Sequence, residues 1–138
     1  MLVTRRVAAV RESTDGSVVH YADENGHIWR TPAAGGAPTL VLQRPRKAAY
    51  GGEWLARPQG IYRVNEQARP RLAIEFFAFA TGRSAPVRVP AGPYDRGSGF
   101  SVSKDGRWMV YSQMDYHGAD IMLIDNWRWL KPPFQRAQ

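Results

Sequence analysis

The stretch that decides the fold is TDGSVVHY at residues 14–21, which recurs as KDGRWMVY at residues 104–111. Both copies place an Asp-Gly turn before a strand-like segment that ends in tyrosine. Asp-Gly favours a tight turn because glycine adopts positive φ without a steric penalty. The offset from position 14 to position 104 is 90 residues. Four-stranded propeller blades repeat about every 40–45 residues, so this offset corresponds to two blades.

A middle copy is expected near residue 60, where PQGIYRV at residues 58–64 has a shortened turn that keeps the glycine. The later part of the repeat recurs too, since IWRTPAAGGAP at residues 28–38 resembles FAFATGRSAP at residues 77–86. Each consists of an aromatic strand, a glycine turn, Ala-Pro and then a short strand. Repetition with this period predicts an all-β fold made of β-propeller blades.

The remaining segments also favour strands over helices. LAIEFFAF at residues 72–79 is bounded by Pro70 and by a Thr-Gly turn, and its aromatic residues favour a strand. Only DNWRWL at residues 125–130 could hold a helical turn.

Counting strands predicts about three four-stranded antiparallel blades, the last of which lacks its fourth strand. We place the blades at about residues 8–42, 48–89 and 98–124, with residues 1–7 as an outer strand of the velcro type and residues 131–138 as a tail. Propellers typically have about 4–8 blades, so three would leave strand edges and apolar faces uncovered. We expect half of a six-bladed propeller, either completed by a second copy in a homodimer or part of a chain that carries the missing blades.

Composition excludes several classes of site. The chain has 138 residues and no cysteine, which excludes disulfides, thiolate zinc sites, iron–sulfur clusters and cysteine nucleophiles. Its net charge of +7 comes from basic residues that are scattered along the chain, with the densest cluster at residues 44–47. This pattern indicates a basic surface rather than a nucleic-acid interface. The sequence has no signal-peptide pattern and no long apolar run, which favours a cytoplasmic protein without a membrane partner.

The segments GFSVSKDGRWMVYSQMD at residues 99–115 and GADIMLIDNWR at residues 118–128 resemble the last blade of TolB-like, WD-like bacterial β-propellers. The resemblance extends over about residues 7–128. It implies the C-terminal blades of a six-bladed propeller, of the kind attached to winged-helix regulators or Ser/Thr kinases. The chain departs from the pattern where Thr14 and Lys104 replace the turn proline, and it contains neither a winged-helix nor a kinase domain.

Two groups of residues are candidates for a binding site. The first strand of each blade lines the channel of a propeller, which predicts that four residues lie near the channel or its mouth: Arg11, Tyr50, Glu53 and Trp54. The second group consists of two carboxylates and an imidazole expected in one hairpin loop: Asp115, His117 and Asp120. This loop holds too few ligands for a metal site, so no metal and no cofactor are expected.

Other chemistry is weighed against simpler interpretations. Asp15 and Asp105 could be carboxylate sites, but turn formation explains them better. A set of aromatic residues could form a stacking platform, although packing between blades is the more common use of such residues: Trp29, Trp54, Phe76, Phe77, Phe79, Trp108 and Tyr111. GFSVS at residues 99–103 fails the nucleophile-elbow pattern, and the glycine pairs at residues 35–36 and 51–52 fail the Walker pattern.

Three functions stay open. The first is a non-catalytic module that binds a protein, a peptide or another ligand and self-associates to complete a ring. The second is a propeller enzyme, a hydrolase or a lyase, with a site at the channel mouth. The third is binding of an anionic ligand or nucleic acid through the arginines.

Overall fold

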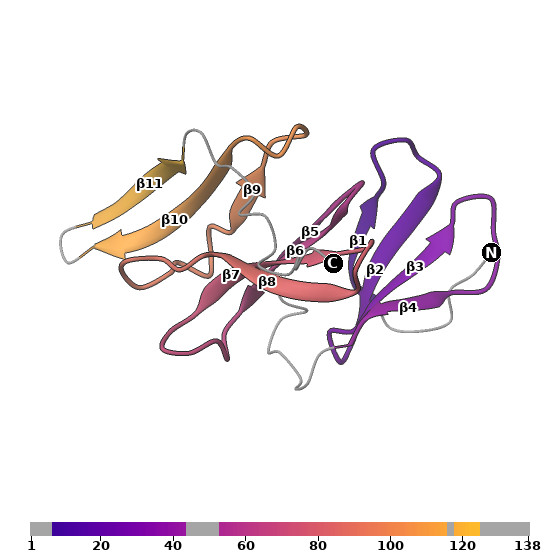
Figure 1. Ribbon diagram of the computed structural model, residues 1–138, viewed down its shortest axis with the longest axis horizontal. Helices are drawn as coiled ribbons and strands as arrows, with labels where there is room; N and C mark the ends of the chain where they lie inside the picture. The colour runs from indigo at the N-terminus through magenta and orange to yellow at the C-terminus, as the bar shows by residue number, and fades with distance from the viewer. Residues whose placement is uncertain (1–6, 44–52, 116–117, 125–138) are drawn as a thin grey trace, which may run out of the picture. The chain divides into compact units, whose positions relative to one another are not determined.

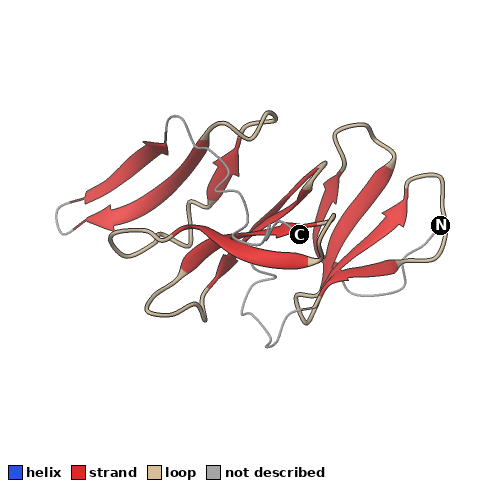
Figure 2. Cartoon of the chain, in the orientation of Figure 1, coloured by secondary structure: helices blue, strands red, loops and turns tan. Residues whose placement is uncertain are grey.

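The computed structural model describes residues 7–43, 53–115 and 118–124, with the backbone alone for residues 115, 118–120 and 124. Every regular element in these ranges is a β-strand, as Figure 2 shows in red. The strands form three antiparallel sheets of four, four and three strands (Figure 1). This confirms the all-β propeller-blade fold. The chain divides into two compact units at residues 91 and 92, and the third sheet lies in the second unit.

In each sheet, strands that follow one another along the chain are neighbours in space. The first sheet has the order β1 (Val7–Glu12), β2 (Val18–Asp23), β3 (Ile28–Pro32), β4 (Thr39–Leu42). The second has the order β5 (Trp54–Arg57), β6 (Gly60–Asn65), β7 (Ala73–Ala78), β8 (Arg83–Arg88). The third has the order β9 (Phe100–Val102), β10 (Met109–Asp115), β11 (Gly118–Ile124).

The repeated Asp-Gly turns have the same geometry in the first and third sheets. Gly16 and Gly106 both have φ of 71°. In each turn the glycine amide donates a 3.0 Å hydrogen bond to the carbonyl of the serine three residues earlier. Asp15 accepts hydrogen bonds from Ser13 Oγ and from the amide two residues ahead, and Asp105 does the same in its own turn. The sequence repeat is therefore a structural repeat, and the interpretation of both aspartates as turn formers is confirmed.

The middle copy uses its glycine differently. Arg57 pairs with Gly60, so only two residues connect β5 to β6. A Cβ on Gly60 would lie 2.0 Å from the carbonyl oxygen of Phe77 and 2.5 Å from Cζ of Phe76. Glycine is required here because the neighbouring strand approaches closely, whereas in the other two copies it supplies a positive φ.

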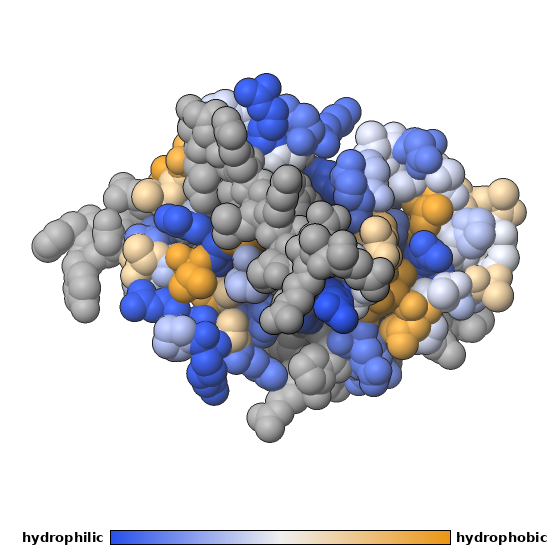
Figure 3. Space-filling model, viewed as in Figure 1, coloured by the Kyte–Doolittle hydropathy of each residue, from blue (hydrophilic) through white to orange (hydrophobic). Residues whose placement is uncertain are grey.

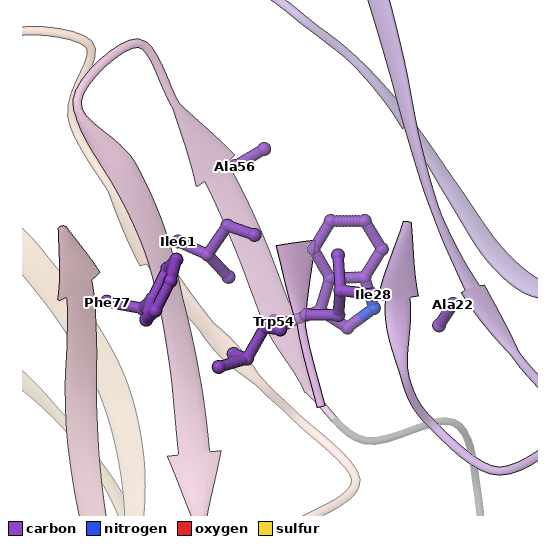
Figure 4. Packing of buried hydrophobic residues seen from close by; sticks show 7 residues of the cluster. Ala22, Ile28, Trp54, Ala56, Ile61 and Phe77 are labelled. Atoms are coloured by element: carbon purple, nitrogen blue, oxygen red, sulfur yellow. The ribbon is translucent and has the colours of Figure 1, made fainter. Parts of the chain in front are cut away.

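One apolar cluster joins the first two sheets within the first unit. Ala22, Ile28 and Leu42 from the first sheet pack against four residues of the second. Figure 4 shows residues of this cluster from both sheets, among them Ile28, Trp54 and Ile61. The residues that the second sheet contributes are Trp54, Ala56, Ile61 and Phe77. Burying a large apolar side chain contributes roughly 1.5–3 kcal/mol, which makes the contact between sheets a main source of stability.

The observed strands differ from the predicted ones in two places. β8 begins at Arg83, directly after the glycine turn, and continues through Pro86, although the Ala-Pro pair was expected to precede the strand. Proline is tolerated here because β8 is the outermost strand of its sheet. The predicted loop at residues 115–120 is also wrong in part, since Asp115 ends β10 and Asp120 lies inside β11.

Several predictions concern segments outside the described residues. These are residues 1–6 of the velcro-type strand, the helical turn at residues 125–130 and the tail at residues 131–138. Val7, the first described residue, begins β1 and pairs with Asp23.

Candidate functional site

Two of the predicted channel residues come together in the first unit. Arg11 lies on β1, and its guanidinium carbon is 5.7 Å from the ring centroid of Trp54, the first residue of β5. A guanidinium at this distance from an indole face gains a cation–π interaction. The Trp54 side chain is buried, whereas Arg11 is exposed. The pair therefore links the two sheets at their first strands.

A charged network runs across the second sheet, beginning at the strand residue opposite Trp54. Trp54 pairs with Arg63, which in turn pairs with Glu75. Arg63 Nη2 donates to Glu75 Oε2 at 2.9 Å, and Asn65 Nδ2 donates to Glu75 Oε1 at 2.7 Å. The carboxylate thus has partners on both oxygens. This network orients the strands of the second sheet and leaves Glu75 unsuited to act as a free general base.

The other predicted site residues are distributed differently. The carbonyl of Glu53 accepts a hydrogen bond from the amide of Val64 at 2.9 Å, which continues the pairing of β5 with β6. Tyr50 and His117 lie outside the described residues. Asp115 pairs with Gly118, and Asp120 pairs with Gln113, so the two aspartates belong to a strand ladder.

The aspartates whose pKa is lowered accept hydrogen bonds that stabilise turns. Hydrogen bonds from Ser13 and Ser17 lower the pKa of Asp15 to about 2. Hydrogen bonds from Ser103 and Arg107 likewise lower the pKa of Asp105. In the part of the chain that the structure describes, no three His, Cys, Asp or Glu side chains come close enough to hold a metal ion.

Asp23 organises the turn between β2 and β3, which the sequence analysis did not identify. Its Oδ1 accepts from the amides of Asn25 and His27, and its Oδ2 accepts from Nε1 of Trp29 at 3.0 Å. Burial raises its pKa, but the hydrogen bonds from Trp29 and the two amides outweigh burial and lower it. An aspartate followed two residues later by Asn-Gly-type turn chemistry is the signal that could have revealed this role.

Most of the aromatic candidates pack in the protein interior. Phe76, Phe77 and Tyr111 are buried, as is Trp54. Tyr62 and Phe76 have ring centroids 4.6 Å apart. The burial of these four side chains agrees with a role in packing, and buried rings cannot serve as a stacking platform for a ligand.

The two most exposed of the large apolar side chains in the described residues lie on the third sheet. Ile121 and Leu123 of β11 are 79% and 63% exposed, and Met114 of β10 is 52% exposed. In the described residues β11 pairs with β10 alone, so its other edge carries unpaired backbone groups. Figure 3 shows apolar residues in orange interrupting a largely hydrophilic surface. An apolar strand with a free edge is a surface on which another strand can add.

No helix among the described residues is long and apolar enough to cross a membrane.

Comparisons with known proteins bear on the fold. No family model matches the sequence, and no curated protein matches it significantly. A solved structure assigned as TolB from Agrobacterium tumefaciens matches with a TM-score of 0.57 and 20% identity, over 83% of this chain and 40% of that one. A structure assigned as a 6-phosphogluconolactonase from Bacteroides fragilis matches with a TM-score of 0.49 and 16% identity, over 86% of this chain and 37% of that one.

The chain therefore spans about 40% of the length of the TolB structure. At 20% identity this likeness shows the fold alone. With sheets of four, four and three strands and no helix in the described ranges, the chain has the fold of β-propeller blades, like the part of the TolB structure that it matches.

Proposed function

We propose that the chain is a non-catalytic β-propeller module that binds protein, and that its first partner is a second copy of itself. The observation that carries this proposal is the apolar edge of β11, which no other strand among the described residues pairs with and where Ile121 and Leu123 are largely exposed. Exposed apolar side chains on a strand edge favour association because pairing removes them from water and completes the backbone hydrogen bonds.

A second copy fits the number of sheets. The chain forms three sheets and spans 40% of the TolB structure that it matches. Two copies supply 3 + 3 = 6 sheets, which lies within the usual range of about 4–8 blades for a closed propeller. In a six-sheet ring with two-fold symmetry, the β11 edge of each copy would meet the same surface of the other copy, so both edges are covered by equivalent contacts.

The non-catalytic part of the proposal is supported by the hydrogen bonding of four of the described carboxylates. Asp15, Asp23 and Asp105 accept hydrogen bonds within turns, and Glu75 is engaged by Arg63 and Asn65. Each is committed to holding local structure, and none is presented as a proton donor or nucleophile. A hydrolase with a site at the mouth of the propeller would need groups beyond these.

Light scattering coupled to size exclusion tests the association. We expect a mass of 2 × 15.5 = 31 kDa at micromolar concentration. The double variant Ile121→Asp/Leu123→Asp should run at 15.5 kDa, because a charge in a strand-pairing interface disfavours pairing. Val89→Asp, at a position 43% exposed in the first unit, is the matched control and should stay dimeric.

A wild-type mass of 15.5 kDa at every concentration would overturn self-association. A double variant that stays dimeric would show that the partner binds elsewhere. Turnover of ester, lactone or glycoside substrates by the purified chain would overturn the non-catalytic assignment.

A further inference from the structure

His20 lies on β2 in the middle of a row of basic residues. It pairs with Arg11 on β1 and with Arg30 on β3. Residues directly opposite one another on neighbouring antiparallel strands place their side chains on the same face of the sheet, where like charges destabilise pairing. His20 is nevertheless only 5% exposed. A neutral imidazole is compatible with this position, whereas an imidazolium would be a third positive charge between two arginines.

The imidazole of His20 also forms part of the contact between the first two sheets. It stacks on the phenyl ring of Phe79, with centroids 5.9 Å apart and an angle of 3° between the planes. Phe79 follows β7, is held by a 3.0 Å hydrogen bond from its amide to the carbonyl of Gln59, and packs against the apolar cluster that joins the sheets. A change at His20 therefore acts directly on this contact.

Among the described residues, no hydrogen-bond partner is present to stabilise a charge on Nδ1 of this imidazole, which is buried. Directly opposite His20 on the neighbouring strands are Arg11 and Arg30, whereas Glu12 of β1 pairs with Val19, and the second sheet faces the ring with the phenyl group of Phe79. Burial, and secondly the charge of Arg30, lower the pKa of His20. Arg11 is directed to the Trp54 ring instead.

We propose that His20 is a pH-sensitive contact within the propeller: its neutral imidazole holds the first and second sheets together, and its protonation loosens them. Because the pKa is lower in the folded protein than in the unfolded chain, the unfolded chain binds the proton more readily. The contribution of His20 is therefore fully present above about pH 6.5 and is lost as the pH falls below that value. Acidification would open the faces that the two sheets now bury against each other.

Two measurements on the whole chain test this device. NMR titration of the histidine ring protons should give His20 a pKa below the ordinary value of 6.5. Amide exchange, corrected for the intrinsic rate, should show that β2 and β5 lose protection between pH 8 and pH 5. The ratio of open to closed states should rise up to about tenfold for each pH unit between the folded and unfolded pKa values.

Matched variants distinguish the effect of protonating His20 from other effects of low pH on the protein. His20→Phe keeps a ring to stack on Phe79 and cannot be protonated, so its protection should change little between pH 8 and pH 5. His27→Asn replaces the other described histidine of the first sheet, beside Asp23, and should keep the pH response of the wild type. If His20→Phe folds poorly, Arg30→Gln serves instead, and it should raise the pKa of His20 and weaken the pH response.

The proposal is overturned if His20 titrates at or above pH 6.5. It is also overturned if His20→Phe loses protection on acidification as much as the wild type does.

Discussion

The outermost strands of the second and third sheets differ in the kind of side chains that they expose to solvent. β8 carries Arg83, Arg88 and Pro86, so its free edge is charged and interrupted by a residue without an amide hydrogen. β11 carries Ile121, Met122 and Leu123 in succession, and the first and last of these are more than half exposed. Both strands lie at the edge of an antiparallel sheet.

This difference shows how a repeated unit is adapted at each position. Charge and proline on an edge strand oppose the addition of another strand, whereas an apolar stretch such as residues 121–123 of β11 permits it. The second sheet keeps its apolar residues inside, between strands and against the first sheet. The third sheet exposes part of its apolar surface, which is where the proposed function has a second copy bind. The predictions below test this contrast.

The largest effect is expected in the buried cluster of the second sheet. Phe77→Ala should lower the free energy of unfolding by about 3–5 kcal/mol, because it removes a buried aromatic side chain and leaves a cavity. Urea denaturation measures the change. Leu123→Ala is the matched control on the third sheet. It should change the free energy of unfolding of the monomer by less than about 0.5 kcal/mol, since the Leu123 side chain is exposed. Equal losses in the two variants would contradict the contrast.

A slightly smaller effect is expected at the tight turn of the second sheet. Gly60→Ala should cost about 3 kcal/mol, because the new methyl group meets the backbone oxygen of Phe77. Gly82→Ala is a useful control, since a Cβ there has open space but φ is +63°. Its cost should be about 1 kcal/mol, from backbone strain alone. Thermal or urea unfolding compares the two, and a Gly60→Ala variant as stable as the control would disprove the close approach.

Alkaline pH tests the interior of the second sheet. Burial raises the pKa of Tyr62 to about 12, although the nearby charge of Arg57 opposes this. The folded protein therefore holds this proton more tightly than the unfolded chain, and stability falls as the pH rises above 10. The loss should be roughly 1 kcal/mol at pH 11 and should be absent in Tyr62→Phe. Urea unfolding at pH 8 and pH 11 measures it, and an equal loss in both proteins would exclude Tyr62 as the cause.

The smallest effect on stability is expected when the edge strand β11 is given a charged residue like those of β8. Leu123→Lys gives β11 a charge like those of β8, and it should weaken self-association at least tenfold while changing the stability of the monomer by less than about 0.5 kcal/mol. Sedimentation equilibrium measures the dissociation constant. Arg88→Leu on β8 is the reciprocal variant and should create new association. Unchanged association in Leu123→Lys would remove β11 from the interface.

The sequence predicted the repeated elements because their signals are local. An Asp-Gly turn depends on the positive φ of glycine and on hydrogen bonds within a few residues, so TDGS at residues 14–17 and KDGR at residues 104–107 could be interpreted without tertiary information. The strand at residues 73–78 followed from aromatic content and flanking breakers. Strand limits were less accurate where burial decided them, as at β8, because an edge position makes proline acceptable.

The candidate site depended on contacts between distant segments, and only part of it could be predicted. Arg11 and Trp54 were each expected near the channel or its mouth from blade geometry, but the contact of the guanidinium with the indole required the packing of two sheets. Nothing local in the sequence indicated that His20 would be buried between Arg11 and Arg30 or stacked on Phe79, because cross-strand register and sheet packing place these groups.

The sequence by itself determined that this protein is built from repeated antiparallel strands joined by glycine turns, because period, turn chemistry and β-propensity are properties of short segments. The tertiary structure alone decided which surfaces are covered and which are free. Burial depends on the atoms that neighbouring sheets bring together, which is why the apolar residues of β7 became core while those of β11 became a surface.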